Sequence, residues 1–254
     1  MSNQDTKAGD KGRNMSATWR PSTAAPNRKA KSSSNYRGDP NNPGNQSANI
    51  PDNENCATWW TNLPADCTYE MLFDSIRSVG AISHAVINPP TGAHRTSAAK
   101  IEFFERASID RLMAQWRNGH IRGHMRVGGR IPHITLNRIK VPAFSNIVPD
   151  HMGNNGRGSR VLQVIGDPRI IQQEHLENIL ASPPNKIIYG LERARTTRQS
   201  DGTNCVEFRF ASYVVQAVRA WEAFMAQKQR VDLPVEEVAL WMDVKCVHAP
   251  DPCG

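Results

Sequence analysis

The residues of this chain best suited to chemistry with a partner are two adjacent tryptophans, Trp59 and Trp60. They lie in residues 56–64, where β-branched and aromatic side chains predict a short strand that ends at a turn. Successive side chains of a strand point to opposite faces, so Trp60 is expected in a core and Trp59 on the other face. A large aromatic ring on an open sheet face is either covered by another part of the protein or used as a platform for a partner.

A long basic stretch follows the tryptophans. Residues 111–149 contain no Asp or Glu but seven cations, which are Arg111, Arg117, Arg122, Arg126, Arg130, Arg138 and Lys140. Unopposed cations on a sheet edge would bind the phosphates of a nucleic acid, with an affinity that falls steeply as salt is added. The alternative is a solvated basic edge that only prevents pairing with other strands.

Patterns for catalysis or metal binding are not recognisable in the sequence. His120 and His124 would share a metal ion only on a helix, and their surroundings predict strand or loop. The glycines Gly153, Gly156 and Gly158 neither follow a hydrophobic strand nor begin a helix, which argues against a phosphate-binding loop. The chain has no nucleophile elbow and no Walker loop. We therefore expect no enzyme activity, no cofactor and no metal.

The elements that must position these residues follow one another in a familiar order over residues 54–140. They are a strand at 56–64, a helix from the cap Thr68 to before Gly80, strands at 81–87 and 95–104, a helix at 106–116 stopped by Asn118 and Gly119, and a strand at 131–139. The order β-α-β-β-α-β is that of a ferredoxin-like sandwich, in which two helices cover one face of a four-stranded antiparallel sheet. The other face is left open.

The same order recurs after residues 141–159, a linker rich in Pro, Asn and Gly. The second copy, residues 160–248, is predicted to contain strands at 160–166, 186–191, 204–210 and 238–247 and helices at 172–181 and 213–228. The predicted fold class is therefore α+β, with two ferredoxin-like sandwiches in tandem.

Composition predicts an intracellular protein with a polyanionic partner. The formal charge is +7, and no segment approaches the roughly 18 apolar residues of a membrane span or the hydrophobic run of a signal peptide. The five cysteines are scattered, which predicts free thiols. Residues 1–50 carry eight basic and three acidic residues with few aliphatic ones, so we expect a disordered tail. This tail is an electrostatic arm, a nuclear-import patch that would favour the nucleus over the cytoplasm, or simply solvated.

Residues 58–63, Thr-Trp-Trp-Thr-Asn-Leu, resemble the hexamer of the RNA recognition motif (RRM) family, and residues 96–103 lie where the octamer of that family is expected. More narrowly, the chain is similar to a fungal group of RRM proteins. The resemblance implies a single-stranded RNA partner and a role in mRNA processing or post-transcriptional regulation. The family stacks bases on three outward aromatic rings. Here only Trp59 remains, because Ala98 and Lys100 occupy the octamer positions. Stacking is worth about 1–3 kcal/mol per base, so the two missing rings would cost on the order of 2–6 kcal/mol unless other contacts replace them.

We therefore expect RNA on the sheet face and basic edge of the first copy. The expected contacts are Trp59, Asn62, Arg95, Lys100, Arg122, Arg126, Arg130, Arg138 and Lys140. Lys100 would either contact a phosphate or lie over the indole of Trp59.

The second copy is a degenerate match, because Gln163, Cys205 and Glu207 stand at its stacking positions. We expect it to bind RNA weakly or not at all and to serve as a structural or protein-binding domain. A mobile basic loop with Arg193, Arg195 and Arg198 is the exception, since it could touch a phosphate backbone. The competing hypothesis for the whole chain is a protein-interaction module that has lost RNA binding. The oligomeric state is left open.

Overall fold

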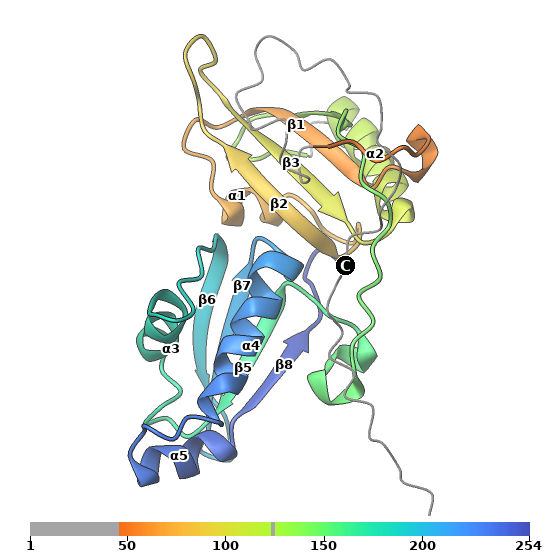
Figure 1. The fold of residues 1–254 in the computed structure, drawn as a ribbon. Helices are drawn as coiled ribbons and strands as arrows, with labels where there is room; N and C mark the ends of the chain where they lie inside the picture. Colours follow the sequence, from red (N-terminus) through yellow and green to blue (C-terminus); the bar gives the residue numbers. More distant parts are fainter. Residues whose placement is uncertain (1–45, 123–124) are drawn as a thin grey trace, which may run out of the picture. The chain divides into compact units, whose positions relative to one another are not determined.

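The structure is a computed structural model that describes residues 46–122 and 125–254. The predicted disordered tail lies outside the described residues up to position 45. All described residues belong to one compact unit of the chain, 37–254. That unit contains two four-stranded antiparallel sheets with their helices (Figure 1).

The first domain has the predicted order of elements. Its elements are the short helix η2 (Asp52–Glu54), β1 (Ala57–Leu63), α1 (Tyr69–Asp74), β2 (Ile82–Asn88), β3 (Ser97–Phe103), α2 (Arg106–Arg122) and β4 (His133–Leu136). The strand order in the sheet is β2-β3-β1-β4, with all neighbours antiparallel. This order confirms the ferredoxin-like fold.

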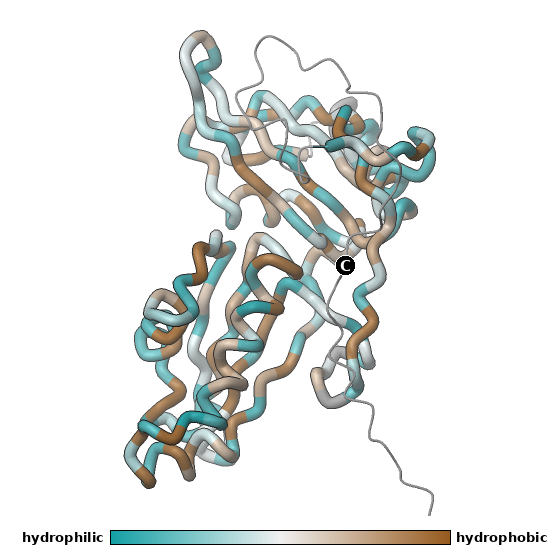
Figure 2. The backbone as a smooth tube through the Cα atoms, in the orientation of Figure 1, coloured by the Kyte–Doolittle hydropathy of each residue, from teal (hydrophilic) through white to brown (hydrophobic). Residues whose placement is uncertain are grey.

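Alternation of side chains along the strands separates the two faces of the first sheet. In β3, Ala99, Ile101 and Phe103 are buried, whereas Lys100 and Glu102 between them are partly exposed. Figure 2 shows hydrophilic and hydrophobic residues mixed along the strands of this sheet. The buried face packs against residues of both helices, namely Leu72 and Phe73 of α1 and Ile109 and Leu112 of α2. Both helices therefore cover the same face, and the opposite face of the sheet is not covered by them.

Three boundaries of the first domain differ from the prediction. Helix α1 begins after the predicted cap Thr68, whose side chain accepts a hydrogen bond from Met71 N, but it ends at Asp74 and not near Gly80. Helix α2 continues through Gly119, because an isolated glycine in a helix is tolerated at modest cost. Strand β4 is shorter than predicted, and it begins only after Pro132, which cannot donate to the ladder.

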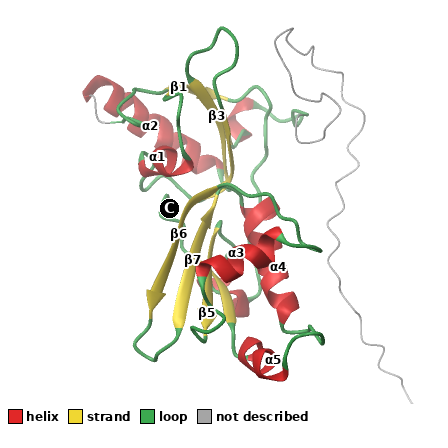
Figure 3. Cartoon of the chain, turned by 90° about the vertical axis from the view of Figure 1, so that its left-hand side faces the viewer, coloured by secondary structure: helices red, strands yellow, loops and turns green. Residues whose placement is uncertain are grey.

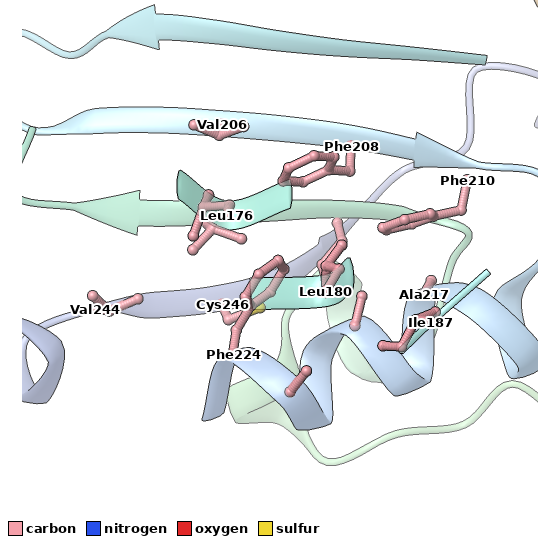
Figure 4. Close-up of a cluster of buried hydrophobic side chains, with 14 of the residues drawn as sticks. Leu176, Leu180, Ile187, Val206, Phe208, Phe210, Ala217, Phe224, Val244 and Cys246 are labelled. Atoms are coloured by element: carbon pink, nitrogen blue, oxygen red, sulfur yellow. The ribbon is translucent and has the colours of Figure 1, made fainter. Parts of the chain in front are cut away.

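The second domain repeats the fold with one additional helix. Its elements are β5 (Val161–Gly166), α3 (Gln173–Ala181), β6 (Leu191–Arg198), β7 (Asn204–Phe210), a π-helical turn η5 (Tyr213–Ala217), α4 (Val218–Gln227), α5 (Val235–Met242) and β8 (Lys245–Ala249). The strand order is β6-β7-β5-β8. Helices α3 and α4 lie on one face of this sheet (Figure 3), and Leu176, Phe208 and Phe224 meet in the core between them (Figure 4).

Two predicted strands of the second domain were wrong in position. Residues 186–190 form a connection, in which Ile187 reaches the core while Ile188 is 91% exposed. The strand is instead the arginine-rich β6. The predicted mobile basic loop is therefore an edge strand paired to β7. Residues 238–242 belong to α5, whose Trp241 is buried, and the last strand begins only at Lys245.

The predicted linker and the last residues of the predicted tail make defined hydrogen bonds, the first within itself and the second with the chain after β4. Residues 141–159 contain the short helices η3 (Asp150–Met152) and η4 (Asn154–Gly156). Asn146 closes this segment into a loop, since its Nδ2 donates to Gly158 O at 2.7 Å. Residues 47–50 of the predicted tail contact the chain after β4, where Ala48 N donates to Lys140 O at 2.9 Å.

Two further properties bear on the predicted class of protein. None of the helices within residues 46–122 and 125–254 combines the length and apolar character needed to cross a bilayer. The five cysteines are free, and Cys56, Cys205, Cys246 and Cys253 are buried.

Candidate nucleic-acid interface

The two tryptophans of β1 point to opposite faces, as the alternation predicts. Trp60 is fully buried, and its Nε1 donates to Thr58 Oγ1 at 3.0 Å. Trp59 is half-buried and lies on the face opposite the helices. Strand register places Lys100 of β3 and Thr135 of β4 directly beside it, and Val86 of β2 follows Lys100. The indole is therefore one ring in a row of otherwise non-aromatic side chains.

The charge of Lys100 is compensated within this face. Its Nζ lies 2.5 Å from Glu102 Oε1, and the two side chains are only 17% and 15% exposed. A phosphate would have to compete with this carboxylate for the ammonium group, which weakens the expectation of a phosphate contact. The signal for Glu102 was present in the sequence, because the same alternation that places Lys100 outward also places Glu102 outward.

Asn62 serves to shape the end of β1. Its backbone is left-handed, with φ of 62°, at an irregularity in the pairing of β1 with β3, and Asn tolerates this conformation better than most residues. Its side chain donates to Ile131 O at 2.8 Å and accepts from Arg130 Nη2 at 2.6 Å. Asn62 therefore holds Arg130 at this end of the sheet.

The predicted basic edge is divided between the two ends of the first sheet. Arg95, in the connection before β3, and Arg126 and Arg130, in the turn before β4, are exposed where β1 ends. Arg126 Nη1 donates to Gly129 O at 2.8 Å. At the opposite end Arg138 is exposed, while Lys140 makes an ion pair with Asp52 at 2.8 Å. Arg122 is the last residue of α2, and its side chain lies outside the described part of the molecule.

Two members of the acid-free run are opposed by acids from outside it. Besides Lys140, Arg111 pairs with Glu105 at 2.6 Å and donates from Nε to Val79 O. Arg111 and Arg117 also belong to α2, which covers the other face of the sheet. The description of all seven cations as unopposed was therefore wrong, because a sequence window cannot show which distant acids fold back onto it.

The sheet face of the second domain carries a shallow groove of about 370 Å³ lined by Arg193, Arg195, Arg198 and Arg209 around Glu207. Sequence reasoning missed Arg209, which lies two residues after Glu207 in β7 and therefore on the same face, and which was detectable for that reason. Burial raises the pKa of Glu207, but hydrogen bonds from Gln163 and Arg209 outweigh burial and hold its pKa below the ordinary value. Acids also neutralise two of the arginines.

Two arginines of this groove form ion pairs with acids that do not line it. Arg193 pairs with Glu70 at 2.7 Å, and Arg209 pairs with Glu192 at 3.3 Å. Much of the positive charge in the groove is thus compensated inside the protein. The expectation that this domain binds RNA weakly or not at all stays a prediction.

Comparison with known proteins finds only distant structural similarities. No protein-family model and no curated sequence matches the chain. The first two RRM domains of the yeast poly(U) binding protein Pub1 share 16% identity over 77% of this chain and 99% of theirs, with a TM-score of 0.28. The RNA recognition domains 1 and 2 of Sex-lethal from Drosophila melanogaster share 18% identity over 77% and 100%, with a TM-score of 0.26. Similarities this low carry no argument about function, and the ferredoxin-like fold of both halves rests on their own strand order.

Proposed function

We propose that this tandem RRM-like chain binds single-stranded RNA through its first domain and acts as a binding protein without enzyme activity. The observation that carries the proposal is the partly exposed side chain of Trp59 on the helix-free face of a four-stranded sheet. One unpaired base stacks on this indole, which is worth about 1–3 kcal/mol.

The separated arginines provide the contacts to the backbone of the RNA. Strand β1 has seven residues and so spans roughly 20 Å at about 3.3 Å per residue. Arg95, Arg126 and Arg130 at one end and Arg138 at the other therefore contact phosphates on either side of the stacked base. The Lys100–Glu102 pair between them leaves the centre of the face close to neutral.

The biological setting that fits this activity is mRNA processing or post-transcriptional regulation. The basic residues of the N-terminal region support a nuclear location, as an import patch or an additional electrostatic arm.

A protein-interaction module is the second candidate function, and the neutralised centre of the first sheet favours it. In this alternative an apolar peptide covers Trp59 and Val86, which is 37% exposed, while the second domain binds a further protein. The two candidates differ in the salt dependence of binding, because phosphate contacts release counterions and apolar contacts do not.

The test is fluorescence anisotropy of the full chain with a labelled pool of short single-stranded RNAs at several salt concentrations. We expect binding at low salt that weakens steeply as salt rises. The double variant Arg95→Gln, Arg138→Gln should reduce the slope of log K against log salt by about 0.7 per lost phosphate contact. Arg157→Gln is the control, because this exposed arginine lies outside both sheets. Absence of binding at low salt would refute the proposal, and a flat slope would favour the protein-interaction module.

A further inference from the structure

Each domain contributes a residue to the core of the other. Cys253, which follows the last strand of the second domain, has 0% exposure and lies in the hydrophobic core of the first domain. Phe104, which follows β3 of the first domain, lies in the core of the second, 5.4 Å from the ring of Tyr213. Interiors are close-packed, so removing either residue leaves a cavity in the other domain.

A fully buried arginine stands where the two cores meet. Arg160, directly before β5, makes ion pairs with Glu192 at 2.7 Å and with Asp251 at 2.9 Å, and all three side chains are at most 1% exposed. The guanidinium also lies over the ring of Phe73 in α1 of the first domain, 4.1 Å from its centroid. A buried charge needs such partners, so the arginine fixes both acids and the aromatic ring around it.

The segment 251–254 also supplies hydrogen-bond acceptors to the first domain. Cys253 O accepts from Val79 N at 2.9 Å and from Gly80 N at 2.8 Å, and Asp251 Oδ2 accepts from Ile82 N at 2.9 Å. These donors lie between α1 and the start of β2, where helix α1 ended early. A buried backbone N–H without a partner is costly, so this stretch depends on the C-terminal segment.

A backbone contact also covers the edge strand of the first sheet. Ala85 N in β2 donates to Ala211 O at 2.8 Å, and His84 forms an antiparallel bridge with Ser212. An exposed strand edge invites pairing with other chains, and here the residues that follow β7 occupy it.

From these four observations we infer that the first domain is stable only when the second domain is folded against it. Residues 251–254 couple the two domains, so that both fold and unfold as one unit. A domain whose sheet face carries largely compensated charge thereby has a definite role. The stretch 79–85, and with it the first half of β2 in the proposed RNA-binding sheet, is held by contacts from residues 211–212 and 251–254. The inference does not depend on RNA binding.

Native-state hydrogen exchange on the full chain, read at peptide level, tests the inference without RNA. In the unmodified chain, amides in 79–85 should be protected, and core amides of β3 and β7 should exchange through one common unfolding reaction with the same denaturant dependence. In Asp251→Asn, exchange in 79–85 should accelerate by at least about a hundredfold, because removing one partner of a buried ion pair changes an equilibrium constant by roughly two to four factors of ten. Asp243→Asn, at an exposed acid near α5, should leave exchange unchanged.

Two further variants separate the possible outcomes. Removal of residues 251–254 should split the common unfolding reaction of β3 and β7 into two. If Asp251→Asn fails to fold while Asp243→Asn folds, the coupling is supported, and Cys253→Ala, which leaves the ion pairs in place, should still accelerate exchange in 79–85. The inference is overturned if exchange in 79–85 is the same with and without residues 251–254, or if β3 and β7 already unfold separately in the unmodified chain.

Discussion

Replacing Arg160 with methionine should destabilise the whole chain strongly. The change removes two ion pairs, a hydrogen bond to Phe210 O at 3.1 Å and the contact with Phe73. Most of the cost comes from the acids that remain, because the side chains of Glu192 and Asp251 are 1% exposed and Asp251 loses its cation. Removing one partner of a buried pair costs about 3–5 kcal/mol. That loss is a large part of the roughly 5–15 kcal/mol by which proteins are stable.

Urea denaturation measures this loss. With an m-value of about 2 kcal/mol/M, a loss of about 3–5 kcal/mol lowers the midpoint by roughly 1.5–2.5 M. Arg157→Met is the matched control, since this nearby arginine is exposed, and surface substitutions usually change stability by less than about 0.5 kcal/mol. The triple variant Arg160→Met, Glu192→Gln, Asp251→Asn should recover much of the stability, because it leaves no unpaired buried charge. A loss below about 1 kcal/mol in Arg160→Met, or no recovery in the triple variant, would refute the reasoning.

Two further predictions concern the sheet face and the interior. Glu102→Gln should release the ammonium group of Lys100 from its ion pair. RNA binding should then tighten, and the slope of log K against log salt should steepen by about 0.7 for one added phosphate contact. An unchanged slope in anisotropy titrations would show that Lys100 does not reach the RNA. His248 is buried beside Tyr213, and burial lowers its pKa below that of an unfolded histidine. The unfolded chain therefore binds the proton first, so stability is present above the unfolded pKa of about 6.5 and is lost as pH falls below it. His248→Phe should flatten the loss measured by urea denaturation between pH 7 and 5, whereas an identical pH profile would exclude this histidine as its source.

The parts of the fold that alternate regularly were predictable from the sequence. The run around Trp59 and Trp60 and the alternation in β3 specify which face is buried, and the order of elements specifies the ferredoxin-like topology of both halves. Strand β6 was misplaced because Ile187 enters the core from a connection and not from a strand, whereas the strand itself presents arginines to solvent. Apolar character thus signals burial, and burial does not require a strand.

The electrostatic part of the candidate site was less predictable. Lys140 meets Asp52 and Arg111 meets Glu105 only after folding, so a run without acids does not measure local charge. The buried cluster is further out of reach, because Arg160 and Asp251 lie 91 residues apart with no pattern that links them. The alternation around Glu102 was the exception, since it was present in the sequence and would have indicated the neutral centre of the first sheet.

RNA binding by the first domain, as proposed, depends most directly on the ring of Trp59. The most direct test measures the affinity of the full-length Trp59→Ala variant for short single-stranded RNA. The control is Thr135→Ala, since Thr135 is an exposed neighbour of Trp59 on the paired strand β4. We predict that Trp59→Ala weakens binding by about 5-fold to 150-fold, as expected for the loss of one stacked base, while Thr135→Ala changes it little. The salt slope should remain the same in both variants, because no phosphate contact is removed. Equal affinities of Trp59→Ala and the unmodified chain would contradict the account.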